Sequence, residues 1–209
     1  MSIVGKKYTD MSENAMNEMG DTFKINVLQE ALENKKKIIL FWYPKDFTFV
    51  CPTEIHAFQS KLSEFEKRNT MVIGASCDTP EVHFAWLSTP KDNGGIEGVT
   101  FPLIADSTRH LSETLDILDT EYVGTEENYS IEGDNVSYRA TFLIDEEGTI
   151  FHESVNVMPL GRNVDEYLRL IDGYAHNQKH GEVCPANWEE GKEAMSESRE
   201  SVANYLSKQ

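Results

Sequence analysis

Cys51 is the residue in this sequence best placed for nucleophilic chemistry. A thiol attacks only as its thiolate, and an ordinary cysteine is mostly protonated at neutral pH. Pro52 follows directly, and proline favours the first position of a helix, so Cys51 is predicted at or beside a helix N-cap. The unpaired N–H groups of such a helix end stabilise an anion. We therefore predict a reactive thiolate at Cys51 in preference to a cysteine that only packs in the core.

The remaining cysteines suggest no disulfide framework. The chain has three cysteines, an odd number, and none forms a Cys-x-x-Cys pair, which disfavours both a structural framework and a dithiol oxidoreductase. Cys77 ends a predicted buried strand, so core packing is its favoured interpretation. Residues 1–8 contain no apolar stretch typical of a secretory signal. We expect a cytoplasmic protein whose thiols are reduced at rest.

A zinc site is the main alternative for the third cysteine, Cys184. His176, His180 and Cys184 are spaced so that a continuous helix would align three ligands. Gly181 and Pro185 interrupt such a helix. We therefore favour an interpretation without a metal.

Size and charge restrict the function classes. The 209 residues suit one domain with an appendage. The formal net charge of -17 disfavours a nucleic-acid reader and an anionic membrane surface as partner. No apolar run reaches the 18 residues that suggest a membrane-spanning helix. We expect neither nucleic acid nor membrane as a partner.

Strands and helices alternate around Cys51. Continuous apolar runs predict buried strands, and apolar residues at helical spacing predict amphipathic helices. The predicted strands are 38–43, 71–76, 101–105, 141–144 and 150–155, and the predicted helices begin at Cys51 or span 80–87, 108–118 and 164–174. The last two strands flank a Glu146-Glu147-Gly148 turn and form a hairpin. The pattern predicts an α/β fold with a central mixed sheet flanked by helices.

Two regions differ from this pattern. Residues 119–136 are acidic, contain Gly124 and Gly133 as breakers, and predict an exposed insertion to which we assign no function. The chain turns polar after His176 and ends in a charged, helical tail. We therefore predict a main domain over 1–176 and a C-terminal arm over 177–209 that carries Cys184.

Two motifs resemble one enzyme family. The segment from Pro44 to Cys51 has the Pro-x-x-x-Thr-x-x-Cys pattern of the peroxiredoxins, and Val183-Cys184-Pro185 with Trp188 resembles the resolving segment of their typical 2-Cys group. That group includes the alkyl hydroperoxide reductase C proteins and thioredoxin peroxidases. The resemblance extends from about Ile38 to the C-terminus, with both motifs in the family's order and spacing. It implies a thioredoxin-like fold.

The resemblance also implies roles for individual residues. Cys51 corresponds to the peroxidatic cysteine, whose thiolate becomes a sulfenic acid on attacking a peroxide oxygen. Thr48 corresponds to the hydroxyl that hydrogen-bonds the peroxide, and Pro44 to the ring that shields the sulfur. Arg139 corresponds to the arginine that favours the thiolate, and a guanidinium suits this role because it stays charged and offers several donors.

Three further positions complete the site that the resemblance implies. Glu54 and Arg162 correspond to residues that orient Arg139, although a surface charge near a helix start remains the alternative for Arg162. Cys184 corresponds to the resolving cysteine. In typical members it attacks the sulfenic acid of the partner subunit, which gives an intermolecular disulfide.

The resemblance implies a thiol peroxidase that needs no metal or flavin of its own. We expect hydrogen peroxide and organic hydroperoxides as substrates, and thioredoxin or a flavoprotein disulfide reductase as electron donor. A homodimer is expected, with a decamer of five dimers as the larger assembly. A ring-shaped holdase chaperone is the alternative function. His83 and Trp86 are expected to pack beside the active site, and the aromatic residues Trp42, Phe47 and Phe49 to form apolar walls or subunit contacts.

Two segments depart from the oxidation-sensitive members of that group. Those members carry Gly-Gly-Leu-Gly and Tyr-Phe, where this chain has Gly94-Gly95-Ile96-Glu97 and Tyr205-Leu206. In such proteins the two segments pack together and slow disulfide formation. Our hypothesis is an intermediate sensitivity of Cys51 to overoxidation.

Overall fold

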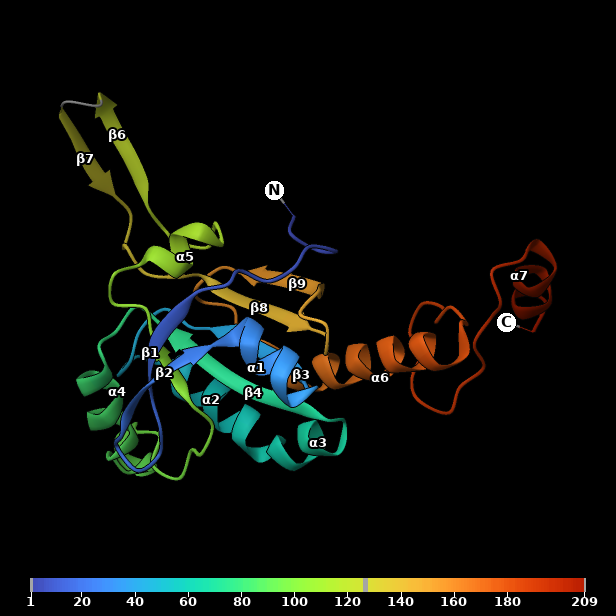
Figure 1. The fold of residues 1–209 in the computed structure, drawn as a ribbon, viewed down its shortest axis with the longest axis horizontal. Coiled ribbons are helices and arrows are strands. Elements are labelled where there is room, and N and C mark those ends of the chain that lie inside the picture. Colours follow the sequence, from blue (N-terminus) through green and yellow to red (C-terminus); the bar gives the residue numbers. More distant parts are fainter. Residues whose placement is uncertain (1, 126–127, 209) are drawn as a thin grey trace. The chain divides into compact units, whose positions relative to one another are not determined.

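A seven-stranded mixed sheet organises the computed structural model, which describes residues 2–125 and 128–208 (Figure 1). The strand order is β2-β1-β5-β4-β3-β8-β9. The strands are β1 (Ser12–Met16), β2 (Thr22–Asn26), β3 (Lys37–Trp42), β4 (Thr70–Ser76), β5 (Leu103–Ala105), β8 (Arg139–Ile144) and β9 (Ile150–Asn156). The strands β3, β4 and β5 are parallel, whereas β8 is antiparallel to β3. The predicted central mixed sheet is confirmed.

Helices cover both faces of this sheet because β3 is buried on both sides. They are α1 (Val27–Asn34), α2 (Cys51–Ser60), α3 (Leu62–Lys67), α4 (Pro80–Leu87), η1 (Lys91–Asn93) and α5 (His110–Thr114). Leu40 shares one core cluster with Ala31 of α1 and Leu111 of α5. On the other face Phe41 stacks on Phe58 of α2, with ring centroids 4.0 Å apart. Such complementary packing fixes where α2, and thus Cys51, begins.

The helix after Cys51 and the helix predicted over 108–118 differ from the expectation. Lys61 divides the first into α2 and α3 because it leaves helical geometry at φ -105° and ψ 6°. The second is shorter, His110–Thr114, because Asp116 adopts a left-handed φ of 57°, which a continuing helix does not allow. The strands β1 and β2, of which β2 is an edge of the sheet, were not predicted from the sequence.

The acidic insertion forms a separate two-stranded hairpin. Its strands are β6 (Glu121–Thr125) and β7 (Asn128–Glu132), and every described residue in them is exposed. Figure 1 shows the pair extending away from the central sheet. The predicted exposure is confirmed for the described residues, and positions 126 and 127 lie outside them.

The C-terminal segment is a second compact unit that begins at Asn163. It consists of α6 (Val164–His180) and α7 (Arg199–Leu206), joined by an irregular connection. The unit boundary after Arg162 differs from the boundary expected at residue 176, which lies inside α6. Among the described residues, no helix combines the length and the apolar character that a membrane span requires.

Candidate active site

Cys51 is the first residue of α2 and is fully buried. Val50 is the N-cap and Pro52 occupies the first turn, where its missing N–H is no loss. Thr53 and Glu54 turn their N–H groups back to the Val50 carbonyl. The predicted placement of Cys51 beside the N-cap is therefore confirmed, and its sulfur lies at the positive end of the helix dipole.

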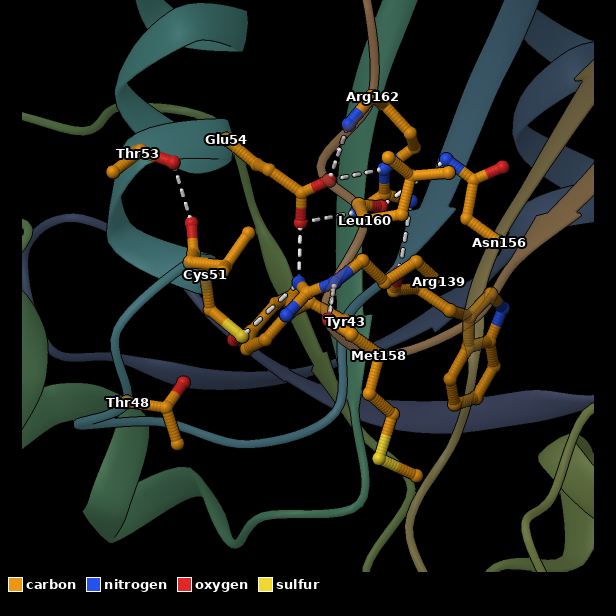
Figure 2. A network of polar contacts seen from close by, with 12 residues as sticks. Tyr43, Thr48, Cys51, Thr53, Glu54, Arg139, Asn156, Met158, Leu160 and Arg162 are labelled. Carbon is orange, nitrogen blue, oxygen red and sulfur yellow. Dashed lines mark hydrogen bonds and ion pairs between the residues drawn. The ribbon is translucent and has the colours of Figure 1, made fainter.

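Arg139 contacts the sulfur directly. Its Nη1 donates a hydrogen bond to Cys51 Sγ at 3.3 Å and another to Glu54 Oε2 at 2.6 Å. Its Nε donates to the Met158 carbonyl at 2.5 Å, which fixes the plane of the guanidinium. Figure 2 shows Arg139 between the sulfur and the Glu54 carboxylate. A fixed cation with spare donors beside a sulfur stabilises negative charge on it.

Glu54 holds Arg139 in place together with Arg162. The Arg162 Nε and Nη2 groups donate to Oε1 and Oε2 of Glu54 at 2.8 and 2.9 Å, in a bidentate pair. Its Nη1 donates to the carbonyls of Trp42 and Ala140, both at 2.9 Å. The Arg162 side chain is 1% exposed, so the alternative of a surface charge is wrong.

The charges of this buried group explain what it does to the sulfur. Arg139 and Arg162 bring two positive charges, and Glu54 brings one negative charge, with all three side chains at most 4% exposed. Buried charges are costly unless they are paired. The remaining positive charge lies beside the Cys51 sulfur, so the network stabilises negative charge that develops there.

Thr48 and Pro44 lie on the loop that joins β3 to α2. Thr48 Oγ1 donates to the Lys45 carbonyl at 2.8 Å, so its oxygen lone pairs are left to accept. Figure 2 shows the Thr48 side chain on the same side as the Cys51 sulfur. Pro44 is buried and follows Tyr43, whose ring is also buried. The loop that leads into α2 therefore carries both residues.

Asp46 is a site residue that the sequence analysis missed. Its Oδ2 lies 2.7 Å from His83 Nδ1, and its backbone N–H donates to Asp78 Oδ2 at 2.8 Å. Burial by itself lowers the pKa of His83, but the hydrogen bond and charge of Asp46 outweigh it and raise that pKa above its ordinary value. His83 is buried as expected. The contact ties the Cys51 loop to α4, and no local pattern in the sequence indicates it.

Cys184 lies in the second unit, in a small cage formed by α6 and the turn that follows. Its thiol donates to the Gly173 carbonyl at 3.5 Å, and the Trp188 ring packs over Gly173. Burial raises the pKa of this thiol, the Arg169 cation lowers it, and Glu182 raises it, with a net increase. The raised pKa favours a neutral thiol in this arrangement, which we call the stored form of Cys184.

The geometry after α6 does not support the zinc alternative. Gly181 ends α6 in a left-handed conformation at φ 66°, so Cys184 is not on the same helix as the two histidines. His176 Nε2 instead contacts Glu182 Oε2 at 2.8 Å. Within the part of the chain that the structure describes, no group of three or more metal-binding side chains occurs.

Cys77 is 7% exposed, and burial raises its pKa, which fits core packing.

Comparison with known proteins identifies the family. The model of the AhpC/TSA family matches residues 4–153, and the model of the C-terminal domain of 1-Cys peroxiredoxin matches residues 174–208. The chain belongs to the AhpC/TSA family. The second match covers the segment that carries Cys184.

Individual relatives agree with the AhpC/TSA assignment. The chain is 45% identical to alkyl hydroperoxide reductase C of Helicobacter pylori over 82% of this chain and 80% of that protein. It is 39% identical to alkyl hydroperoxide reductase C of Buchnera aphidicola over 100% of this chain and 98% of that protein. A crystal structure of reduced Plasmodium vivax 2-Cys peroxiredoxin matches with a TM-score of 0.88 and 39% identity. The match covers 99% of this chain and 100% of that chain. The chain is a thiol-dependent peroxidase with the thioredoxin-like fold of this family.

Proposed function

We propose that this peroxidase reduces hydrogen peroxide and organic hydroperoxides at Cys51. The contact between Arg139 Nη1 and the sulfur carries the proposal, because it places a fixed cation where negative charge develops. The thiolate attacks one peroxide oxygen, so an S–O bond forms as the O–O bond breaks. The other oxygen leaves with the electron pair and takes up a proton as water or an alcohol. Cys51 is then a sulfenic acid.

Cys184 resolves this sulfenic acid in the proposed cycle. Its sulfur attacks the Cys51 sulfur, a disulfide forms, and the hydroxyl leaves as water with the thiol proton. We assign the attacking Cys184 to a partner subunit, as the family resemblance implies. Phe47 and Phe49 on the Cys51 loop support a subunit contact because they are 53% and 94% exposed, and neighbouring aromatic side chains so exposed favour burial by a second chain.

Assembly, location and recycling complete the proposal. We infer a homodimer that forms a decamer of five dimers, in the cytoplasm. A dithiol protein, thioredoxin or a flavoprotein disulfide reductase, returns the disulfide to two thiols. The net charge of -17 on this chain favours a protein reductant with a positively charged surface.

Non-reducing electrophoresis tests the cycle. One equivalent of hydrogen peroxide should give a covalent dimer in the wild type and in Cys77→Ser, the matched control. Neither Cys51→Ser nor Cys184→Ser should give this dimer. A wild type that consumes peroxide but stays monomeric on the gel would show that the intersubunit assignment of Cys184 is wrong.

A further inference from the structure

The β6–β7 hairpin has one apolar face that nothing in the described chain covers. Tyr122 pairs with Ile131, and Gly124 pairs with Tyr129, so these side chains project from the same face. Tyr122, Ile131 and Tyr129 are 56%, 50% and 59% exposed, and the two tyrosine rings contact edge to face with centroids 5.6 Å apart. A two-stranded hairpin gains stability when such a face packs against something. An exposed aromatic cluster of this kind marks an interaction surface.

The opposite face carries an uncompensated pair of acids. Glu121 lies directly across from Glu132, and like charges directly opposite in a sheet destabilise it. Within the described residues neither carboxylate forms an ion pair. Residues 119–136 contain six acidic residues and no Lys or Arg. A cationic side chain from outside would relieve the repulsion, so the hairpin favours a basic partner.

The base of the hairpin lies at the active-site end of the sheet. The chain passes from β7 to Arg139, the first residue of β8. Ser137 Oγ donates to the carbonyl of Tyr43 at 3.0 Å, and Tyr43 is the first residue after β3, at the start of the Cys51 loop. At the start of β6, Tyr122 Oη donates to Glu113 Oε1 of α5 at 3.2 Å. A partner bound to the hairpin is therefore held near the end of β3 that leads into the Cys51 loop.

These observations exclude the other occupants. A second copy of the chain would bring the same acidic hairpin against this one, so pairing of one hairpin with another is repelled. An anionic lipid surface or a nucleic acid is repelled for the same reason. We propose that the β6–β7 hairpin docks the disulfide reductant, a dithiol protein with Lys or Arg around an apolar patch. This inference rests on the proposed Cys51–Cys184 cycle.

Steady-state turnover with two kinds of reductant tests the inference. Peroxide reduction is measured with dithiothreitol, with thioredoxin and its reductase, and with a flavoprotein disulfide reductase. The variants are Tyr129→Ser/Ile131→Ser for the apolar face and Glu121→Lys/Glu132→Lys for the acidic face. Glu18→Lys/Glu33→Lys is the control, because it makes the same charge change at two exposed positions outside the hairpin.

The hairpin variants should raise the KM for the protein reductant that recycles the wild type by about tenfold. Turnover with dithiothreitol should stay at the wild-type value, and the charge variant should lose the salt dependence of the KM. Equal KM values in wild type and variants would overturn the proposal. So would a changed sedimentation coefficient with unchanged KM, which would assign the face to self-association. If the wild type does not reduce peroxide with dithiothreitol, the proposed cycle is contradicted. If it turns over with dithiothreitol but with neither protein reductant, the docking proposal is overturned and the cycle stands.

Discussion

Arg139 contacts Cys51 across 88 positions of the sequence, with Nη1 3.3 Å from Sγ. The two residues begin different elements, Arg139 at the start of β8 and Cys51 at the start of α2. Because β8 is antiparallel to β3, its start lies where β3 ends and the Cys51 loop begins. The contact is therefore a product of sheet topology, and it depends on strand order as much as on the two side chains.

Replacement of Arg139 should slow the attack on peroxide. Arg139→Met removes a fixed donor from the place where negative charge develops, so the rate constant of Cys51 with hydrogen peroxide should fall by roughly 10²- to 10³-fold. Arg139→Lys keeps the charge without the planar set of donors and should recover part of the loss. Stopped-flow fluorescence measures both. Arg68→Met is the control, since Arg68 pairs with Glu64 within one partly exposed turn of chain away from Cys51. An equal fall in this variant would refute the assignment.

Replacement of Glu54 should destabilise the fold as well as the site. Glu54→Gln leaves the Arg139 and Arg162 guanidinium groups without their carboxylate and turns an amide N–H₂ toward donors. Breaking a buried pair in this way costs about 3–5 kcal/mol of unfolding free energy. Urea unfolding of reduced protein measures the change. Glu64→Gln, in an exposed ion pair, should leave the midpoint nearly unchanged, and a similar stability of both variants would contradict the role of Glu54.

The local part of the site could be predicted from the sequence. Cys51 followed by Pro52 is a pattern with a physical cause, and the continuous apolar run at 38–43 identified β3 because a strand buried on both faces has no polar alternation. The helix of residues 80–87 has the predicted bounds because Pro80 marks its start. Each of these signals acts within a few residues of the chain.

The non-local part could not be predicted from physical patterns alone. The contacts of Glu54 with Arg162 and of Asp46 with His83 join separate elements, and the sequence carries no local sign of them. A resemblance to a family indicated the first contact, and nothing indicated the second. The strands β1 and β2 were missed because each is only five residues long and carries polar residues among its apolar ones.

The reactivity of Cys184 should increase steeply with pH in the reduced protein. Burial raises the pKa of this thiol above its ordinary value, so the thiolate is a small fraction at neutral pH and grows about tenfold per pH unit below the pKa. Alkylation of Cys184 in Cys51→Ser/Cys77→Ser, followed by mass spectrometry, measures the profile. Denatured protein is the reference and should level off at lower pH. Coincident profiles would show that the cage around Cys184 does not protect it.

Gly173→Ala should increase overoxidation of Cys51. Gly173 lies inside α6, and a methyl group there would meet the Cys184 sulfur and the Trp188 ring at 3.7 Å, an ordinary packing distance. The alanine adds contacts to the stored form of Cys184 and stabilises the helix by up to about 1 kcal/mol. Release of Cys184 becomes slower, so the sulfenic acid of Cys51 has more time to react with a second peroxide.

Mass spectrometry after a peroxide titration measures this competition between disulfide and sulfinic acid. Gly173→Ala should form sulfinic acid at several-fold lower peroxide than the wild type. Gln178→Ala is the matched control, because it also introduces alanine into α6, but at an exposed position nearer the end of the helix. If both variants shift equally, helix stability alone explains the effect. If Gly173→Ala forms disulfide faster than the wild type, docking of Cys184 does not limit resolution, because tighter packing around the thiol would then have failed to delay it.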